Sequence, residues 1–250
     1  MILKVLSYNI HKGFDWNNKN YFLKEIKDFI KTLDVDIVFL QEVVGKNTHL
    51  EKSGLIDTQF EFLADELWPH YSYAHNAVYD HGHHGNLILS KYPILSFENI
   101  NISTNRFEQR GFLVCKIALN ESNRYFFAIC SHLNLFNSGR QIQYQMIKKI
   151  LLEDKFNAVS VIFAGDFNDW NKKSAHIIED QLNFIEVFKE LGGDYAKTFP
   201  APLPFLCLDR VYIKNAKVFC AKIFHPEKNN PITHFSDHLP IYCEVSLYES

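Results

Sequence analysis

The chain has 250 residues, of which 47% are hydrophobic and 22% are charged, and its formal net charge is −3. This length is enough for one large domain with a substantial core. The nearly balanced charge excludes the strongly basic composition that non-specific binding of duplex nucleic acid usually requires, so contact with nucleic acid would need a local basic groove.

Cysteine usage and hydropathy indicate the compartment. Five cysteines without a CxxC pair fit free, buried thiols in a reducing environment. No apolar run approaches the ~18 residues of a membrane span, and the opening MILKVLSYNI alternates like a strand and is too short in apolar residues for a signal peptide. We therefore expect a cytoplasmic monomer with a single domain over residues 1–250. Secretion without an N-terminal signal and peripheral contact with a membrane stay open as alternatives.

The order strand, helix, strand occurs twice. Both central segments have apolar side chains at helical spacing, and the outer segments resemble buried strands. The segments are 2–9, 19–33 and 36–42 in one half, and 125–132, 138–154 and 159–166 in the other. The four strands end in Asn9, Glu42, His132 and Asp166. Helices beside strands indicate an α/β fold with two sheets face to face and helices outside, so these polar ends should gather along one edge.

More polar side chains stand at the ends of later strands. Asp209 interrupts the apolar run LCLDRVYI, where a carboxylate is costly unless it is paired or functional. Oxygen-bearing and imidazole side chains without sulfur favour Mg²⁺ or Mn²⁺ over structural zinc, and a histidine beside a carboxylate suits proton transfer. The residues predicted to form this site are Asn9, Glu42, His132, Asp166, Asn168, Asp209, Asp237 and His238.

Two further segments carry candidate substrate contacts. In 79-YDHGHHGN-86 we expect a flexible loop on the substrate side, from which His84 and Asn86 face phosphate. Its histidines lie too close together to wrap one ion as a helical pair would, although a second metal site is a minor alternative. His11 and Lys12 follow Asn9 and would add positive charge near the site.

Other interpretations concern single residues. Glu42 could pair with a surface lysine such as Lys46, and Asp209 could pair with Arg210. The loops after the predicted strands also carry aromatic side chains, which could cover the core, stack on a base or rest against a lipid interface. These aromatic residues are Phe14, Trp16, Phe136 and Trp170.

The motifs together resemble a known family. SYNIHKG, FLQEV, GNLILSKYPI, SHLNL, GDFND, LDRVYI and SDHLP occur in the order typical of the endonuclease/exonuclease/phosphatase superfamily, across essentially the whole chain. GDFN or SDH alone is weakly specific, whereas the ordered set is very specific. The segments NIHKGF, GHHGN and SDHLP are most similar to a bacterial branch of the superfamily. The resemblance implies a four-layered α/β/β/α sandwich of two mixed sheets, with metal-dependent hydrolysis of a phosphoester.

The resemblance also implies a metal site and a water-activating group. Glu42 resembles the principal ligand of Mg²⁺ or Mn²⁺, with Asn9 and Asp237 as further ligands or water-mediated partners. Asp166 resembles the residue that orients or deprotonates the attacking water, with Asn168 helping to place it.

Further roles concern the phosphate. His238 resembles the histidine that contacts the scissile phosphate and is held by Asp209, and His132 takes the other phosphate-facing position. Arg110 resembles, more loosely, a basic residue that faces the site from the start of the neighbouring strand.

Three functions are consistent with these features. The first is a phosphodiesterase or phosphatase acting on a small or lipid-linked phosphoester. The second is a magnesium-dependent nuclease on DNA or RNA, disfavoured because no extended basic stripe occurs. The third is a catalytically silent binding scaffold, disfavoured because every motif residue is present. One or two metals, and mono- or diester preference, are not determined by the sequence.

Overall fold

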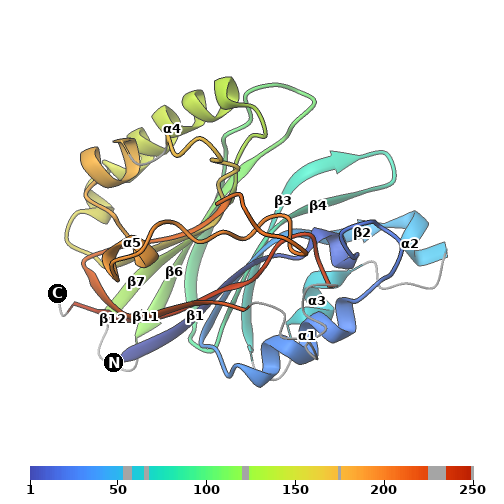
Figure 1. Ribbon diagram of the computed structural model, residues 1–250, viewed down its shortest axis with the longest axis horizontal. Coiled ribbons are helices and arrows are strands. Elements are labelled where there is room, and N and C mark those ends of the chain that lie inside the picture. The colour runs from blue at the N-terminus through green and yellow to red at the C-terminus, as the bar shows by residue number, and fades with distance from the viewer. Residues whose placement is uncertain (53–57, 65–67, 120–123, 174–175, 225–234, 249–250) are drawn as a thin grey trace.

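Two six-stranded mixed sheets pack face to face in the computed structural model, with the longer helices on the outside (Figure 1). The structure describes residues 1–52, 58–64, 68–119, 124–173, 176–224 and 235–248. The predicted α/β sandwich is confirmed. The segment 225-HPEKNNPITHF-235, whose prolines and polar residues predict a loop, lies outside the described residues except for Phe235.

The first sheet contains the N-terminal half of the predicted repeat. β1 and β2 are parallel neighbours, and the C-terminal strand β12 pairs with the other side of β1 in antiparallel orientation. In sheet order, the strands are β11 (Ala216–Ile223), β12 (Ile241–Leu247), β1 (Ile2–Asn9), β2 (Ile37–Asn47), β4 (Gly82–Ser90) and β3 (His70–Tyr79).

The second sheet contains the other half of the repeat. β7 and β8 are parallel neighbours, and β10 runs antiparallel to β8. In sheet order, the strands are β5 (Ile94–Asn101), β6 (Gly111–Leu119), β7 (Arg124–His132), β8 (Val161–Asp166), β10 (Asp209–Lys214) and β9 (Ile185–Glu186).

The two principal helices, α1 (Leu23–Thr32) and α4 (Asn137–Leu151), are those of the predicted repeat. α1 begins later than the predicted residue 19, because Asp15 and Asn20 form a turn in which the Asn20 amide donates to the Asp15 carboxylate at 2.8 Å. The shorter helical segments are η1 (His11–Gly13), α2 (Thr48–Lys52), α3 (Gln59–Leu63), η2 (Asp154–Phe156), η3 (His176–Gln181) and α5 (Val187–Glu190).

Three hydrophobic layers hold the sandwich together. The central layer lies between the sheets and includes Val5, Phe39 and Ile162. One outer layer packs α1 through Ile26 against the first sheet, and the other packs α4 through Ile147 against the second. Burial of this apolar area is the main driving force for the fold, and it makes both sheets rigid supports for the side chains at their ends.

The cysteines and the helices agree with the composition. All five cysteines are unpaired, and four of them are buried. Within the described ranges, every helix is too short or too polar to pass through a bilayer.

Glu186 gives a prediction for stability. Its carboxylate caps α5 by accepting from the amides of Phe188 and Lys189, both at 3.0 Å, and burial raises its pKa from 4.5 to about 7 despite these bonds. The folded state therefore holds a proton that the unfolded state releases first, so stability falls as pH rises from 4.5 to 7. We expect Glu186→Gln to remove this decline and to stabilise the protein above pH 7, by at most about 3 kcal/mol.

The measurement is chemical denaturation of both proteins at pH 5 and pH 8. The variant should gain over the wild type only at the higher pH. An equal difference at both values would show that the carboxylate charge contributes nothing.

Candidate active site

Strand pairing alone assembles half of the site. In the second sheet Asp166, at the end of β8, is the register partner of His132 on β7 and of Asp209 on β10. Three strands of one sheet therefore place three polar side chains in a row. The predicted convergence of strand ends is confirmed for this sheet.

Asn9 joins the first sheet to the second. Its amide Nδ2 donates to Asp166 Oδ2 at 3.1 Å and approaches Glu42 Oε1 at 3.4 Å. The backbone carbonyl of Asn9 accepts from the Ser236 hydroxyl at 2.7 Å, which fixes the segment carrying Asp237 and His238 beside the end of β1. Asn9 therefore does more than cap a turn after β1, because its amide lies between two carboxylates.

Glu42 is turned into the site by an irregularity in β2. The register with β4 shifts between Leu40 and Val43, and Glu42 has a φ of 57°. A bulge re-aims a side chain at the cost of local strain, and such strain occurs preferentially at functional sites. The predicted strand end at Glu42 is thus a bulge within a strand that continues to Asn47.

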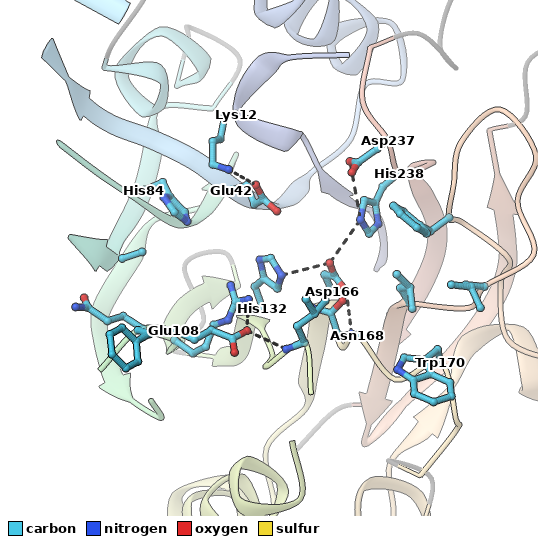
Figure 2. Close-up of a pocket in the computed structure, with 18 of the residues that line it drawn as sticks. Lys12, Glu42, His84, Glu108, His132, Asp166, Asn168, Trp170, Asp237 and His238 are labelled. Carbon is cyan, nitrogen blue, oxygen red and sulfur yellow. Dashed lines mark hydrogen bonds and ion pairs between the residues drawn. The ribbon is translucent and has the colours of Figure 1, made fainter. Parts of the chain in front are cut away.

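The two carboxylate oxygens of Asp166 have different partners. Its Oδ1 accepts from the backbone amide of Asn168 at 2.9 Å, while Oδ2 is 3.4 Å from His132 Nε2 and 3.6 Å from His238 Nε2 (Figure 2). Gly165 precedes it with a φ of 151°, and a Cβ there would lie 1.9 Å from the Ser131 carbonyl oxygen. Only glycine permits this close approach of β7 and β8.

His238 is held by a buried carboxylate behind it. Its Nδ1 is 2.8 Å from Asp209 Oδ2, which also accepts from the Thr198 hydroxyl. The neighbouring Arg210 directs its guanidinium to backbone carbonyls, among them those of Cys207 and Asp169. The alternative in which the Asp209 carboxylate pairs with Arg210 is therefore wrong.

The two histidines beside Asp166 differ in charge. Burial and the nearby Arg110 hold the pKa of His132 well below its usual value, so it is neutral. Burial also disfavours the His238 cation, but Asp209 and Asp166 overcome this and raise the pKa of His238 to about 10. Burial raises the pKa of Asp166, and the His238 cation opposes that effect. Opposite shifts among neighbouring groups are typical of sites that move protons.

Glu42 is ionised and paired with Lys12. Lys12 Nζ lies 3.0 Å from Glu42 Oε2, and the alternative of a pair with Lys46 is wrong. Burial alone would raise the pKa of Glu42, but Lys12 and the neighbouring histidines hold it far below its usual value.

Arg110 lines the pocket from the position just before β6, and the residue that holds it was not predicted from the sequence. Glu108 Oε1 accepts from Arg110 Nη2 at 2.7 Å and from the Leu135 amide at 2.9 Å. Arg110 Nε is buried and makes no hydrogen bond within the described chain. Spacing gave no signal for Glu108, because its partner Leu135 belongs to a loop 27 residues further along.

The β3–β4 hairpin differs from the expected loop. His83 and His84 lie within β4, paired with β3, and His84 lines the pocket. Burial and Lys12 lower the pKa of His84 to about 4. Asn86, predicted to face phosphate, instead donates from its buried amide to the carbonyls of Gly111 and Cys130, at 3.2 and 3.3 Å, between the sheets.

The pocket over these residues has a volume of about 490 Å³ and a partly apolar rim. Tyr79, Phe107, Leu135 and Trp170 line it and are each more than half exposed. Trp170 therefore does not cover the core, and stacking or lipid contact remain as the interpretations of its role. His11 lies beside the pocket, with Nδ1 3.8 Å from Asp237 Oδ1.

Two groups of side chains could hold a cation. In the predicted group, Glu42 and Asp237 offer carboxylate oxygens, whereas Asn9 turns its amide Nδ2 toward Glu42 and Asp166. In the second group, Asp166, Asp209 and His238, the potential ligand atoms lie within 4.8 Å of one another. Because His238 Nδ1 already donates to Asp209 Oδ2 at 2.8 Å, the second group fits an orienting pair better than a pair of metal ligands.

Face-to-face sheets with carboxylates and histidines gathered at one end define a class of α/β-sandwich enzymes. A profile of the endonuclease/exonuclease/phosphatase family matches residues 6–238, a range that includes both Asn9 and His238. The chain belongs to this family, whose members are hydrolytic enzymes acting on phosphoesters.

Relatives extend this assignment over the whole chain. A protein of Escherichia coli (strain K12), described as uncharacterized protein YbhP, is 41% identical over 247 residues, which cover 98% of this chain and 96% of that protein. The mannosyl-6-phosphatase Bt3783 of Bacteroides thetaiotaomicron shares the fold with a TM-score of 0.71 and 17% identity, over 98% of this chain and 100% of that one. D. rerio TDP2, complexed with a single-stranded DNA product, does so with a TM-score of 0.70 and 19% identity, over 98% and 99%.

Proposed function

We propose that the protein is a hydrolase that depends on Mg²⁺ or Mn²⁺ and cleaves a small or lipid-linked phosphoester. The observation that carries this proposal is the environment of Asp166, a buried carboxylate between a neutral and a charged histidine and linked through Asn9 to Glu42. A binding scaffold would have no need for these opposed charge states.

The donor set fits a hard divalent cation. Glu42 is ionised and Asp237 adds a second carboxylate, without any sulfur, while Asn9 positions Glu42 by donating from Nδ2. Mg²⁺ is usually held by one or two carboxylates together with substrate phosphate oxygens. When bound there, the cation supplies Lewis-acid stabilisation of charge on the phosphate and on the leaving oxygen.

The protein groups supply positioning and proton transfer. Asp166 Oδ2 would accept a proton from the attacking water, while the Asn168 amide fixes the other oxygen of the carboxylate at 2.9 Å. The side chain of Asn168 donates to the Leu133 carbonyl at 3.0 Å, so this residue orients Asp166 and the loop after β7 together. Protonated His238 would stabilise negative charge on phosphorus, and Arg110 would bind a second oxygen. No covalent intermediate is needed.

The surroundings of the phosphate site favour a substrate with an apolar or aromatic group. Basic side chains line the pocket, at Lys12 and Arg110, and the exposed rim carries aromatic and aliphatic side chains. A duplex would present a row of phosphates that such a rim cannot neutralise. The fold does not decide the substrate, since two of the solved structures that share it are a mannosyl-6-phosphatase and a protein complexed with a single-stranded DNA product.

An activity screen tests this ranking. The purified protein with Mg²⁺ is incubated with an aryl phosphodiester, phospholipids, inositol phosphates, single-stranded DNA and plasmid. We expect hydrolysis of a small or lipid-linked ester that stops when the cation is chelated. Plasmid cleavage that disappears in Glu42→Gln would establish the nuclease instead.

Glu42→Gln also has a direct readout in metal binding. Loss of the carboxylate charge should weaken Mn²⁺ binding at least about 10-fold, in a titration that follows the electron paramagnetic resonance signal of the free ion. Glu61→Gln, on the short helix α3, serves as the control and should bind Mn²⁺ as the wild type does. Unchanged binding in Glu42→Gln would move the metal site away from Glu42.

A further inference from the structure

Lys12 forms an ion pair with Glu42, the carboxylate that we assign to the metal. Its Nζ lies 3.0 Å from Glu42 Oε2, while the other oxygen of Glu42 faces the Asn9 amide at 3.4 Å. The two oxygens of the Glu42 carboxylate therefore contact one ammonium group and one amide. Figure 2 shows Lys12 and Glu42 together at the edge of the pocket, facing His132 and His238.

The backbone at Lys12 is built to hold this position. His11, Lys12 and Gly13 have φ values of 45°, 58° and 81°, and such left-handed backbone is costly for the two residues with side chains. The fully buried Gln59 supports it by donating to the Lys12 carbonyl at 2.6 Å and accepting from the Val44 amide at 2.9 Å. Val44 belongs to the same strand as Glu42, so Gln59 connects the lysine to the strand of its partner.

The side chain of Lys12 is more accessible to solvent than that of its partner. It is 42% exposed, whereas that of Glu42 is 17% exposed. The ammonium is a compact charge on a flexible four-carbon stem, so it can reach a new partner by rotation about single bonds. Both residues line the phosphate pocket, which also contains Arg110 and His84.

The charge of Lys12 has opposite effects on a metal cation and on a phosphate. Two cations on one carboxylate repel each other strongly at contact distances, even at an effective dielectric constant of about 20. The same ammonium attracts a phosphate oxygen that enters the pocket. Lys12 therefore should oppose the metal and assist the substrate.

We propose that Lys12 is a resident counter-cation of the metal site, which neutralises Glu42 before a divalent cation binds, lowers the affinity for that cation, and then binds a non-bridging oxygen of the substrate phosphate. This inference rests on the proposed function and adds a determinant of metal affinity and of phosphate binding to it. Its distinguishing consequence is that removal of the ammonium has opposite effects on the two ligands.

The experiment compares two binding equilibria in Lys12→Met and in the wild type. Mn²⁺ binding is followed by the electron paramagnetic resonance signal of the free ion. Binding of inorganic phosphate to protein saturated with Mg²⁺ is followed by calorimetry. We expect Mn²⁺ to bind about 10-fold more tightly in the variant, because a partly exposed repulsive charge is removed. Phosphate should bind about 10-fold more weakly.

Matched variants separate charge from packing. Lys46→Met removes an exposed lysine from the same strand as Glu42 and should change neither equilibrium. Lys12→Arg retains the charge and should keep the metal affinity within about 3-fold of the wild type, whereas Lys12→Gln should reproduce the effect of methionine. Lys12→Gln provides the same comparison if the methionine variant does not fold.

Three results would overturn the inference. Weaker binding of both ligands by Lys12→Met and Lys12→Gln would show that the lysine only supports the pocket. Unchanged binding of both would show that it is a bystander, and tighter metal binding with unchanged phosphate binding would remove it from the substrate site. A wild-type protein that binds no Mn²⁺ would instead contradict the proposed function itself.

Discussion

Asp166→Asn is expected to reduce turnover by about 10³-fold or more while leaving the fold intact. The loss follows from the role of the carboxylate as proton acceptor, because an amide cannot take a proton from water at neutral pH. The measurement is the rate with the substrate found in the screen, under saturating Mg²⁺, together with the melting temperature.

The fold should tolerate this change for two reasons. Asp166 is an ionised group whose burial is unfavourable, as its raised pKa shows, and an amide removes that cost. Neutral His132 can accept through Nε2 from the new amide nitrogen, and the retained oxygen still accepts from the Asn168 backbone amide, although Asn9 Nδ2 loses its acceptor. A shift of melting temperature of a few degrees is therefore expected.

Asp28→Asn is the control for this prediction. Asp28 lies exposed on α1, and its replacement should change neither the rate nor the melting temperature. A large fall in melting temperature for Asp166→Asn would show that Asp166 is structural. Retained turnover would show that another group accepts the proton.

The gathering of polar residues at the strand ends could be predicted from the sequence, because apolar side chains repeat at regular spacing along strands and helices. A strand buried on both faces leaves its polar residue at the point where it leaves the sheet, and parallel strands joined by a helix leave the sheet at the same edge. This reasoning placed His132 beside Asp166 and Asn9 beside Glu42, as the structure has them. The helices and the two-sheet architecture followed from the same periodicity.

What the sequence did not reveal depends on contacts between loops. The partner of Arg110 is Glu108, whose other contact is the backbone of Leu135, and no pattern in the chain relates these positions. Asn86 is predicted to face phosphate from a flexible loop, but the segment is a hairpin and Asn86 donates to backbone carbonyls between the sheets. Alternation in a short, polar strand is easily mistaken for a loop.

His238→Ala is expected to lower turnover by about 10²-fold or more. The imidazolium Nε2 faces the pocket 3.6 Å from Asp166 and 4.0 Å from Asp237, and Asp209 keeps it charged and oriented through Nδ1. Its removal takes away the cation that would stabilise negative charge on phosphorus.

The variant also leaves Asp209 without its charged partner in a buried position, so a loss of stability is expected together with the loss of rate. Addition of imidazole separates the two effects, since the free cation can re-enter the pocket and restore turnover, although it cannot restore the packing of His238 against Phe199 at a ring distance of 4.9 Å. Partial recovery of the rate by imidazole, in a variant still folded at the assay temperature, would assign the role to the charge. A rate close to that of the wild type would remove His238 from the mechanism, and the charge on phosphorus would then have to be met by Arg110 and the metal alone.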